Sequence, residues 1–166
     1  GAVDVTSATV DWHVRDSFVR YIEAGEGIRP SGGARALPAA ADGLRYDFRL
    51  PFARGWYDPA SDTAVLTTRG ALRFSHRAHG IDFTAATGQV ELRGAASRAT
   101  FRFTGEGGTA FDGRRAVLMA LRPGSTREPG QVSGLVPQEA EGSVFAGFYA
   151  PGDPFGWMTI SFTTAA

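Results

Sequence analysis

Short runs in which apolar and polar residues alternate constrain the fold of this chain more than any other feature. In residues 44–50 every second residue is apolar, namely Leu44, Tyr46, Phe48 and Leu50. A period of two is typical of a strand with one buried face. Further strand-like runs occupy residues 63–75, 89–93, 98–104, 115–121, 143–149 and 156–162, with glycine and proline between many of them. This pattern predicts a mainly β fold of antiparallel sheets, arranged as a sandwich or a barrel.

One segment near the N-terminus has a helical period instead. Its apolar residues Val14, Phe18, Tyr21 and Ile22 follow the spacing i, i+4, i+7 and i+8, which places them on one face of an amphipathic helix. The sequence therefore predicts a single α-helix over residues 11–24, packed on a β body of residues 43–163. The glycine-rich segment 25–33 that follows is predicted to be a loop.

Composition limits the classes of protein to which the chain can belong. Its 166 residues are 43% hydrophobic and contain no internal repeat, so we expect one domain over residues 1–166. The 17 basic residues balance the 17 acidic ones, which argues against nucleic acid as a partner. The absence of cysteine excludes disulfides and thiol chemistry. No apolar run approaches the roughly 20 residues of a membrane span, so membrane attachment would require a segment outside this sequence.

Tyr21 admits two interpretations from its position on the buried face of the predicted helix. It could be a core tyrosine whose hydroxyl donates a hydrogen bond to a backbone carbonyl. It could also supply a phenolate ligand to ferric iron, because this anionic oxygen is a known axial ligand of haem. Ser17, four residues earlier, lies along the same side of the helix.

His76 and His79 are the candidates for a second group beside the Tyr21 oxygen. A hydrogen-bond donor at that position would stabilise the phenolate. The His-x-x-His spacing also fits a zinc pair, although no third ligand follows at a suitable spacing. Each histidine could equally be an exposed turn residue. No acid–base pair or nucleophile motif is apparent in the sequence, so we expect a protein that is not an enzyme.

Several motifs together resemble the HtaA family. They comprise Asp11, Trp12, Val14, Ser17, Phe18, Tyr21 and Ile22, then Gly32 and Gly33, then residues 72–75 and 79–82, and finally residues 145–149 followed by Gly152. This resemblance covers residues 9–162. It implies a haem-binding module of actinobacteria, exported to the cell surface or secreted, with a mostly β body and a helix that presents the haem-ligating tyrosine.

The resemblance also implies roles for individual residues. Tyr21 would ligate the iron of ferric haem b, and a histidine would donate a hydrogen bond to its oxygen. Many members carry this histidine at the position of Arg77, so we expect His79 to take the role here, with His76 as second choice. Ser17 is expected to contact a haem propionate, while Phe18 and Trp56 would flank the ring.

The implied function is capture and transfer of haem for bacterial iron acquisition. Its expected partners are haem, host haemoproteins and other haem carriers. The alternative that the residues leave open is a β-sandwich surface domain without a cofactor, serving adhesion or protein binding.

Overall fold

The computed structural model describes residues 1–106, 111–124, 128–138, 144 and 148–165. In this part of the chain, one antiparallel sheet contains twelve strands. They are β1 (Val3–His13), β2 (Gly27–Ser31), β3 (Arg35–Ala36), β4 (Asp47–Leu50), β5 (Phe52–Asp58), β6 (Thr63–Thr68), β7 (Ala71–His76), β8 (Ile81–Leu92), β9 (Arg98–Glu106), β10 (Asp112–Arg122), β11 (Gln131–Leu135) and β12 (Pro154–Thr164). The same residues contain the helix α1 (Asp16–Glu23) and two short 3-10 turns, η1 (Arg77–His79) and η2 (Gly94–Ala96). The predicted mainly β fold is confirmed.

The sheet closes on itself as a barrel. Neighbouring strands pair in the order β12, β11, β10, β9, β8, β6, β5 and β1, and β1 pairs again with β12. The interior is filled by large side chains such as Trp12, Phe101, Phe103 and Met158, each at most 2% exposed. Closure leaves these strands without free edges, since each is paired on both sides.

At one end the barrel opens, because two of its strands change partner along their length. The first part of β1 pairs with β5, whereas Val10–His13 pair with β4. Similarly, β8 pairs with β6 near its end and with β7 near its start. Pro51 separates β4 from β5, and Gly70, with φ of +86°, falls between β6 and β7. The strand-like run at 63–75 is therefore two strands, β6 and β7.

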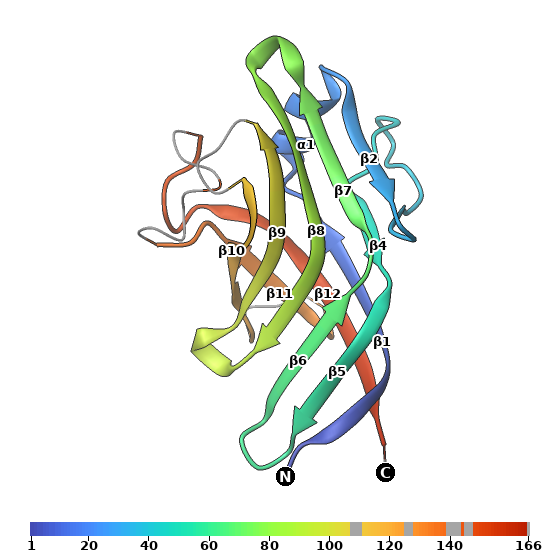
Figure 1. Cartoon of the computed structure of the whole chain (residues 1–166), viewed down its shortest axis with the longest axis vertical. Helices are drawn as coiled ribbons and strands as arrows, with labels where there is room; N and C mark the ends of the chain where they lie inside the picture. The colour runs from blue at the N-terminus through green and yellow to red at the C-terminus, as the bar shows by residue number, and fades with distance from the viewer. Residues whose placement is uncertain (107–110, 125–127, 139–143, 145–147, 166) are drawn as a thin grey trace.

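Helix α1 lies at this open end, beside β2 and β7 (Figure 1). Phe18, Val19 and Ile22 form its buried face. The ring of Phe18 packs against Phe74 on β7, with 5.7 Å between ring centroids. The helix thus completes the core where the sheet has split, which explains why an eight-residue helix is stable here. In the described residues, no helix has the length and apolar character needed to cross a membrane.

The predicted start of the helix was wrong by five residues. The helix begins at Asp16, whereas Asp11–His13 continue β1, and the capping residue is Arg15 with no side-chain cap. Trp12 pairs with Met158 on one side and Phe48 on the other. Pairing with strands on both sides stabilises the extended conformation of this segment more than its helical period favours a helix. The alternation of buried Val10, Trp12 and Val14 was the signal for a strand.

Other predicted boundaries also need correction. The β body begins at Val3, not near residue 43. Most of the predicted loop 25–33 is strand β2, held by its pairing with β7. A further strand, β11, lies outside the strand-like runs identified in the sequence. The strand expected at 143–149 falls mostly outside the described residues, and Phe148 and Tyr149 lie in a turn and a bend.

The hairpin of β7 and β8 is fastened by Asp82. The Arg73 guanidinium donates two hydrogen bonds to this carboxylate, at 2.9 and 2.8 Å, and the Ser75 hydroxyl donates a third at 2.8 Å. These bonds, those from Arg73 first, hold the pKa of Asp82 well below its usual range. Because η1 connects the two strands, this network fixes the base of the turn that carries His79.

Closure of the barrel can be tested at Gly156. Its φ is +72°, and a Cβ there would lie 1.9 Å from the carbonyl oxygen of His13 on β1. We expect Gly156→Ala to lower the free energy of unfolding by about 2–5 kcal/mol, measured by urea denaturation. Gly94→Ala is the matched control, because Gly94 has φ of +56° with open space around it. It should cost only about 1–2 kcal/mol, and equal losses would contradict the proposed clash.

The role of Asp82 can be tested by its pH dependence. Since folding depresses the pKa of Asp82, its contribution is complete above the ordinary aspartate pKa of about 3.9 and declines as pH falls toward the folded value. We expect Asp82→Asn to lower the free energy of unfolding by about 1–3 kcal/mol at pH 7, and less at pH 3. Asp112→Asn should change stability little, because Asp112 bonds only its near neighbour Arg114. A loss at Asp82 that is independent of pH would contradict this assignment.

Candidate functional site

The hydroxyl of Tyr21 lies 2.7 Å from Nδ1 of His79. Tyr21 projects from α1 and is half-buried, while His79 is exposed at the end of η1. The tautomer decides the direction of the bond: a phenol donates to an unprotonated Nδ1, whereas a protonated Nδ1 donates to a phenolate. In either case the second lone pair of the oxygen is left for another partner.

His76 joins this pair through ring stacking. Its imidazole lies 3.9 Å from that of His79 and 5.1 Å from the Tyr21 ring, at interplanar angles of 23° and 19°. The residue is 8% exposed, and its buried Nδ1 has no hydrogen-bond partner among the residues that the structure describes. A buried nitrogen without a partner is costly, so this imidazole is a candidate for a hydrogen bond to a further group.

An exposed aromatic ring adjoins the same group. Phe148 is 47% exposed, and its ring centroid lies 6.2 Å from that of Tyr21. Sequence analysis quoted this residue in a motif without giving it a role. An exposed phenylalanine beside a tyrosine oxygen and two imidazoles provides both apolar contact and polar ligands.

The end of α1 is tied directly to η1. Glu26 accepts a hydrogen bond from the backbone N–H of Arg77 at 2.8 Å, and its own N–H donates to the Ser75 carbonyl. The bond from Arg77 lowers the pKa of Glu26. Gly25 packs so closely on His76 that a Cβ would lie 2.7 Å from that residue's Cα. These contacts hold Tyr21 and His79 in register although 58 residues separate them.

Arg77 occupies the position where many relatives were expected to carry the histidine. Its side chain is directed to Asp82, with 3.8 Å between Nε and Oδ2, and its backbone N–H binds Glu26. Arg77 therefore serves the frame of the turn. Sequence analysis gave Glu26 no role, and only the motif at residues 79–82 contained Asp82.

The start of α1 is fixed by His13. Its Nδ1 lies 3.0 Å from Asp47 of β4, and its Nε2 lies 2.5 Å from Asp16 at the first position of the helix. The imidazole also stacks on Trp157 of β12, with 3.7 Å between centroids. His13 lies on β1. The prediction that it would lie on the helix was wrong. Through these contacts His13 links β1, β4 and β12 to α1, the helix that carries Tyr21.

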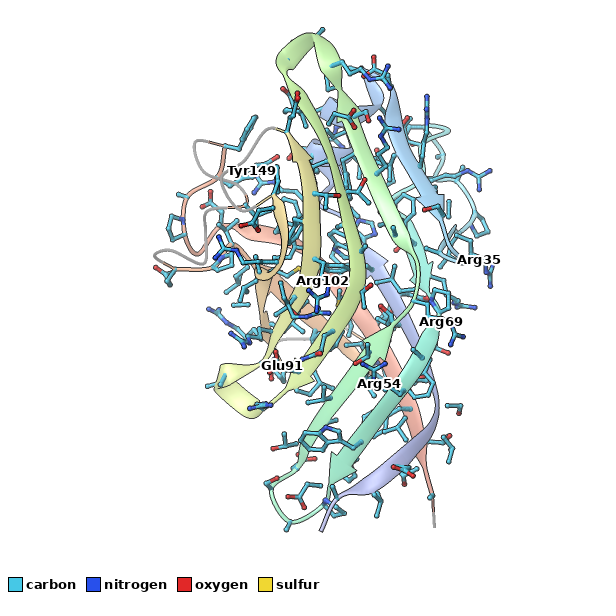
Figure 2. The ribbon with its side chains drawn as sticks, viewed as in Figure 1. Arg35, Arg54, Arg69, Glu91, Arg102 and Tyr149 are labelled. Atoms are coloured by element: carbon cyan, nitrogen blue, oxygen red, sulfur yellow. The ribbon has the colours of Figure 1, made fainter. Side chains whose placement is uncertain are left out.

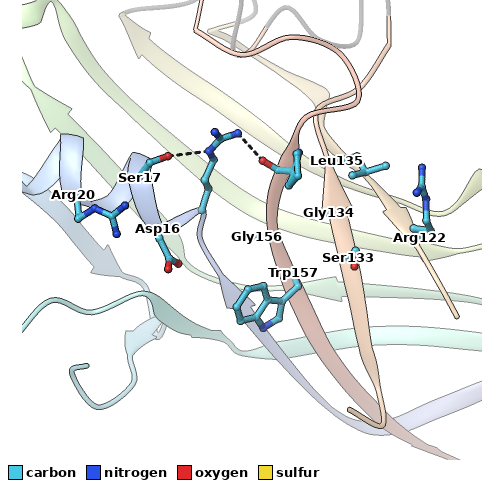
Figure 3. A pocket seen from close by; sticks show the side chains of 11 residues that line it. Asp16, Ser17, Arg20, Arg122, Ser133, Gly134, Leu135, Gly156 and Trp157 are labelled. Carbon is cyan, nitrogen blue, oxygen red and sulfur yellow. Dashed lines mark hydrogen bonds between the residues drawn. The ribbon is translucent and has the colours of Figure 1, made fainter. Parts of the chain in front are cut away.

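A cavity of about 580 Å³ opens beside the first turn of α1. Figure 3 shows Ser17 and Arg20 on one side of it and Ser133, Trp157 and Arg122 on the other. Arg15 bridges it: Nε donates to the Ser17 hydroxyl at 2.9 Å, and Nη1 donates to the Pro154 carbonyl at 2.7 Å. Three arginines against one carboxylate, Asp16, make the cavity suited to anions.

The structure brings only some of the predicted site residues together. Tyr21, His76 and His79 form one cluster, and Ser17 lines the neighbouring cavity. Phe18 is 3% exposed and packs inside the core. Trp56 is on β5, opposite Asp4 and Val65, at the end of the molecule away from α1 (Figure 1). The structure therefore does not bring Trp56 together with Tyr21, since sequence patterns do not show to which end of a barrel a strand leads.

The zinc alternative can also be compared with the geometry. Within the described ranges, no three histidine or carboxylate side chains are grouped so that they could hold a metal ion.

Comparison with known proteins agrees with this fold. The C-terminal domain of HtaA from Corynebacterium glutamicum has a TM-score of 0.72 at 21% identity, covering 98% of this chain and 99% of that one. The heme-binding protein HtaB of the same organism has a TM-score of 0.68 at 20% identity, covering 99% and 96%. The N-terminal domain of HtaA gives 0.64 at 18%, covering 98% and 99%. No curated protein matches the chain. The family model HtaA, described as Htaa, matches residues 7–161, and the chain therefore belongs to the HtaA family.

Proposed function

We propose that this domain binds ferric haem through Tyr21 and passes it on in bacterial iron acquisition. The hydrogen bond between the Tyr21 hydroxyl and His79 is the observation that carries this proposal. A histidine N–H beside the oxygen stabilises a phenolate, and an anionic oxygen is a suitable ligand for ferric iron. The structural relatives include a protein named for heme binding.

The residues around Tyr21 fit such a group. Phe148 offers an exposed apolar ring next to the phenol, as a large flat macrocycle requires. His76 holds a nitrogen with no partner in a nearly buried position, which fits a site kept for ligand binding. When bound, haem would supply an iron that accepts the tyrosine oxygen as a ligand. His79 orients that oxygen, and His76 stacks against the rings of Tyr21 and His79.

The cavity beside α1 suits the acidic side of the same ligand. Ser17 and Tyr21 are four residues apart and lie along one side of the helix. Arg15 and Arg20 line the cavity with Ser17, and guanidinium groups bind carboxylates well. We infer that these residues bind the haem propionates, with Ser17 donating its hydroxyl hydrogen.

The geometry favours a carrier over a catalyst. Tyr21 is half-buried and His79 is exposed, so haem held here would remain accessible to the next carrier. Free haem, host haemoproteins and other carriers are the expected exchange partners. Such a role fits a domain that works outside the bacterial cell, at its surface or after secretion.

The role of Tyr21 can be tested by adding hemin to the purified protein. We expect Tyr21→Phe, which removes only the oxygen, to weaken binding at least 10-fold, or about 1.4 kcal/mol. The Soret position of the ferric complex should also change. Tyr57→Phe is the matched control: the Tyr57 hydroxyl on β5 donates to Asp62 away from α1, so affinity and spectrum should stay unchanged. Wild-type affinity with an unaltered spectrum for Tyr21→Phe would reject the proposal.

The three neighbouring positions 76, 77 and 79 can be separated by their effects on haem release. We expect His79→Ala to speed transfer of haem to apomyoglobin about 10–100-fold, because the hydrogen bond to the tyrosine oxygen is lost. Arg77→Ala should have a much smaller effect, since its side chain reaches only Asp82. If His76→Ala accelerated release more than His79→Ala, the assigned partner of Tyr21 would be incorrect.

A further inference from the structure

A groove on the outer face of the barrel, spanning β5, β6, β8, β9 and β10, has no part in the site at Tyr21. Strand register defines it as two rows of residues that face the same way, because directly paired residues share a face. One row is Trp56, Val65, Glu91 and Arg98, and the next is Arg54, Thr67, Gln89 and Thr100. We call this surface the arginine groove.

The floor of the arginine groove is buried and its rim is exposed. Val65 and Thr67 are 8% and 6% exposed, and Glu91 is 5% exposed. Trp56 at the rim is 37% exposed, and Arg54 is also exposed. Together with Phe148, Trp56 is one of two large exposed hydrophobic residues in the described ranges. Long side chains thus stand around a recessed floor.

Two adjoining cavities form this recess. The first, of about 480 Å³, is lined by Asp4, Arg54, Trp56, Thr67, Gln89 and Arg93. The second, of about 340 Å³, includes Glu91, Arg93, Ser97 and Arg98. Arg93 borders both, so the two cavities lie next to each other on this face. Together the two cavities have room for a short oligomer.

The groove has a positive excess although the whole chain is neutral. Arg54, Arg93 and Arg98 line it and Arg102 and Arg115 adjoin it, facing two carboxylates, Asp4 and Glu91. Figure 2 shows Arg54, Glu91 and Arg102 on the same side of the sheet. Arg93 and Arg98 are paired with Glu91. Arg54 has no hydrogen bond or ion pair to any residue of the described ranges.

Arg115 is close enough to these charged groups to be affected by their electrostatic field. Its Nη1 donates to the Thr87 carbonyl at 2.9 Å and to the Thr100 hydroxyl at 3.1 Å. Burial and the positive charge of Arg102 lower the pKa of Arg115, Glu91 raises it, and Arg54 lowers it further. A bound anion would relieve this repulsion.

The kind of ligand follows from what the groove offers. Its strands are paired on both sides, so their backbone groups are used within the sheet and a peptide could not add as a strand. Recognition must therefore use side chains. Arginines bind oxyanions, an exposed indole offers an apolar face to a ring, and the exposed carboxylate of Asp4 accepts hydrogen bonds from hydroxyl groups.

We propose that the arginine groove binds a carboxylated oligosaccharide, with a sugar ring on Trp56 and a carboxylate on Arg54. Sugar hydroxyls can donate hydrogen bonds to the exposed carboxylate of Asp4. Single-stranded nucleic acid also combines rings with oxyanions, but the described part of the groove offers its successive bases one exposed aromatic side chain, Trp56. An acidic peptide would lack rings for Trp56.

The test uses tri-galacturonate as probe and isothermal titration calorimetry as the measurement. We expect the wild-type protein to bind it, and maltotriose, which has the rings but no carboxylates, to bind at least about 10-fold more weakly. Arg54→Ala should weaken binding about 10-fold and Trp56→Ala about 3–10-fold. Arg35→Ala removes the same charge from exposed β3, away from the groove (Figure 2), and should leave binding within about 2-fold.

Several outcomes would overturn the proposal. They are absence of tri-galacturonate binding, equal affinity for maltotriose, insensitivity to both groove variants, or tighter binding of a hexaglutamate peptide or of an oligothymidylate. The inference is independent of haem binding, so Tyr21→Phe should bind tri-galacturonate as the wild type does. Circular dichroism of the exposed variants, Arg54→Ala and Trp56→Ala, separates loss of binding from loss of fold.

Discussion

The pairing of β1 with a strand on each side is the constraint on which the rest of the structure depends. One side of β1 is joined to β12 over most of its length, which closes the barrel. The other side is shared by β5 and β4, and this change of partner opens the end where α1 lies. Because α1 begins three residues after β1 ends, the ladder that closes the barrel also sets the position of Tyr21. His13 strengthens this link by contacting Asp16 and Asp47.

The other end of α1 has an independent attachment, and this explains how two distant residues can form one site. Glu26 joins the exit of the helix to the turn at Arg77, and Gly25 packs on His76. Asp82 holds the strands that lead into and out of that turn. Tyr21 and His79 are thus presented by elements fixed at both ends, so their 2.7 Å contact requires little reorganisation when a ligand arrives. A site built in this way can lie near the surface and still be well ordered.

How far the sequence predicted the molecule depended on whether local pattern and tertiary pairing agreed. They agreed in residues 46–50, where Tyr46, Phe48 and Leu50 are buried as their alternation predicted. They disagreed at Trp12, which fits a helical period but pairs in two β ladders. The family pattern indicated Tyr21 and its two histidines as candidates. It could not show that Glu26 would tie them together or that Trp56 lies at the opposite end, because both depend on long-range topology.

The arginine groove shows why a neutral net charge says little about local partners. Equal numbers of acidic and basic residues argued against nucleic acid as a partner when they were summed over the chain. Strand register redistributes them: alternation places Arg54, Gln89 and Glu91 on the outer face while Leu66 and Val90 face the core. Carboxylates such as Glu26 and Asp82 meanwhile serve the turn near Tyr21. Since exposed charges act over about 10 Å in physiological salt, a ligand experiences only the face that it meets. Recognition by this domain is therefore determined by how the sheet sorts its charges between faces, a property that composition does not contain.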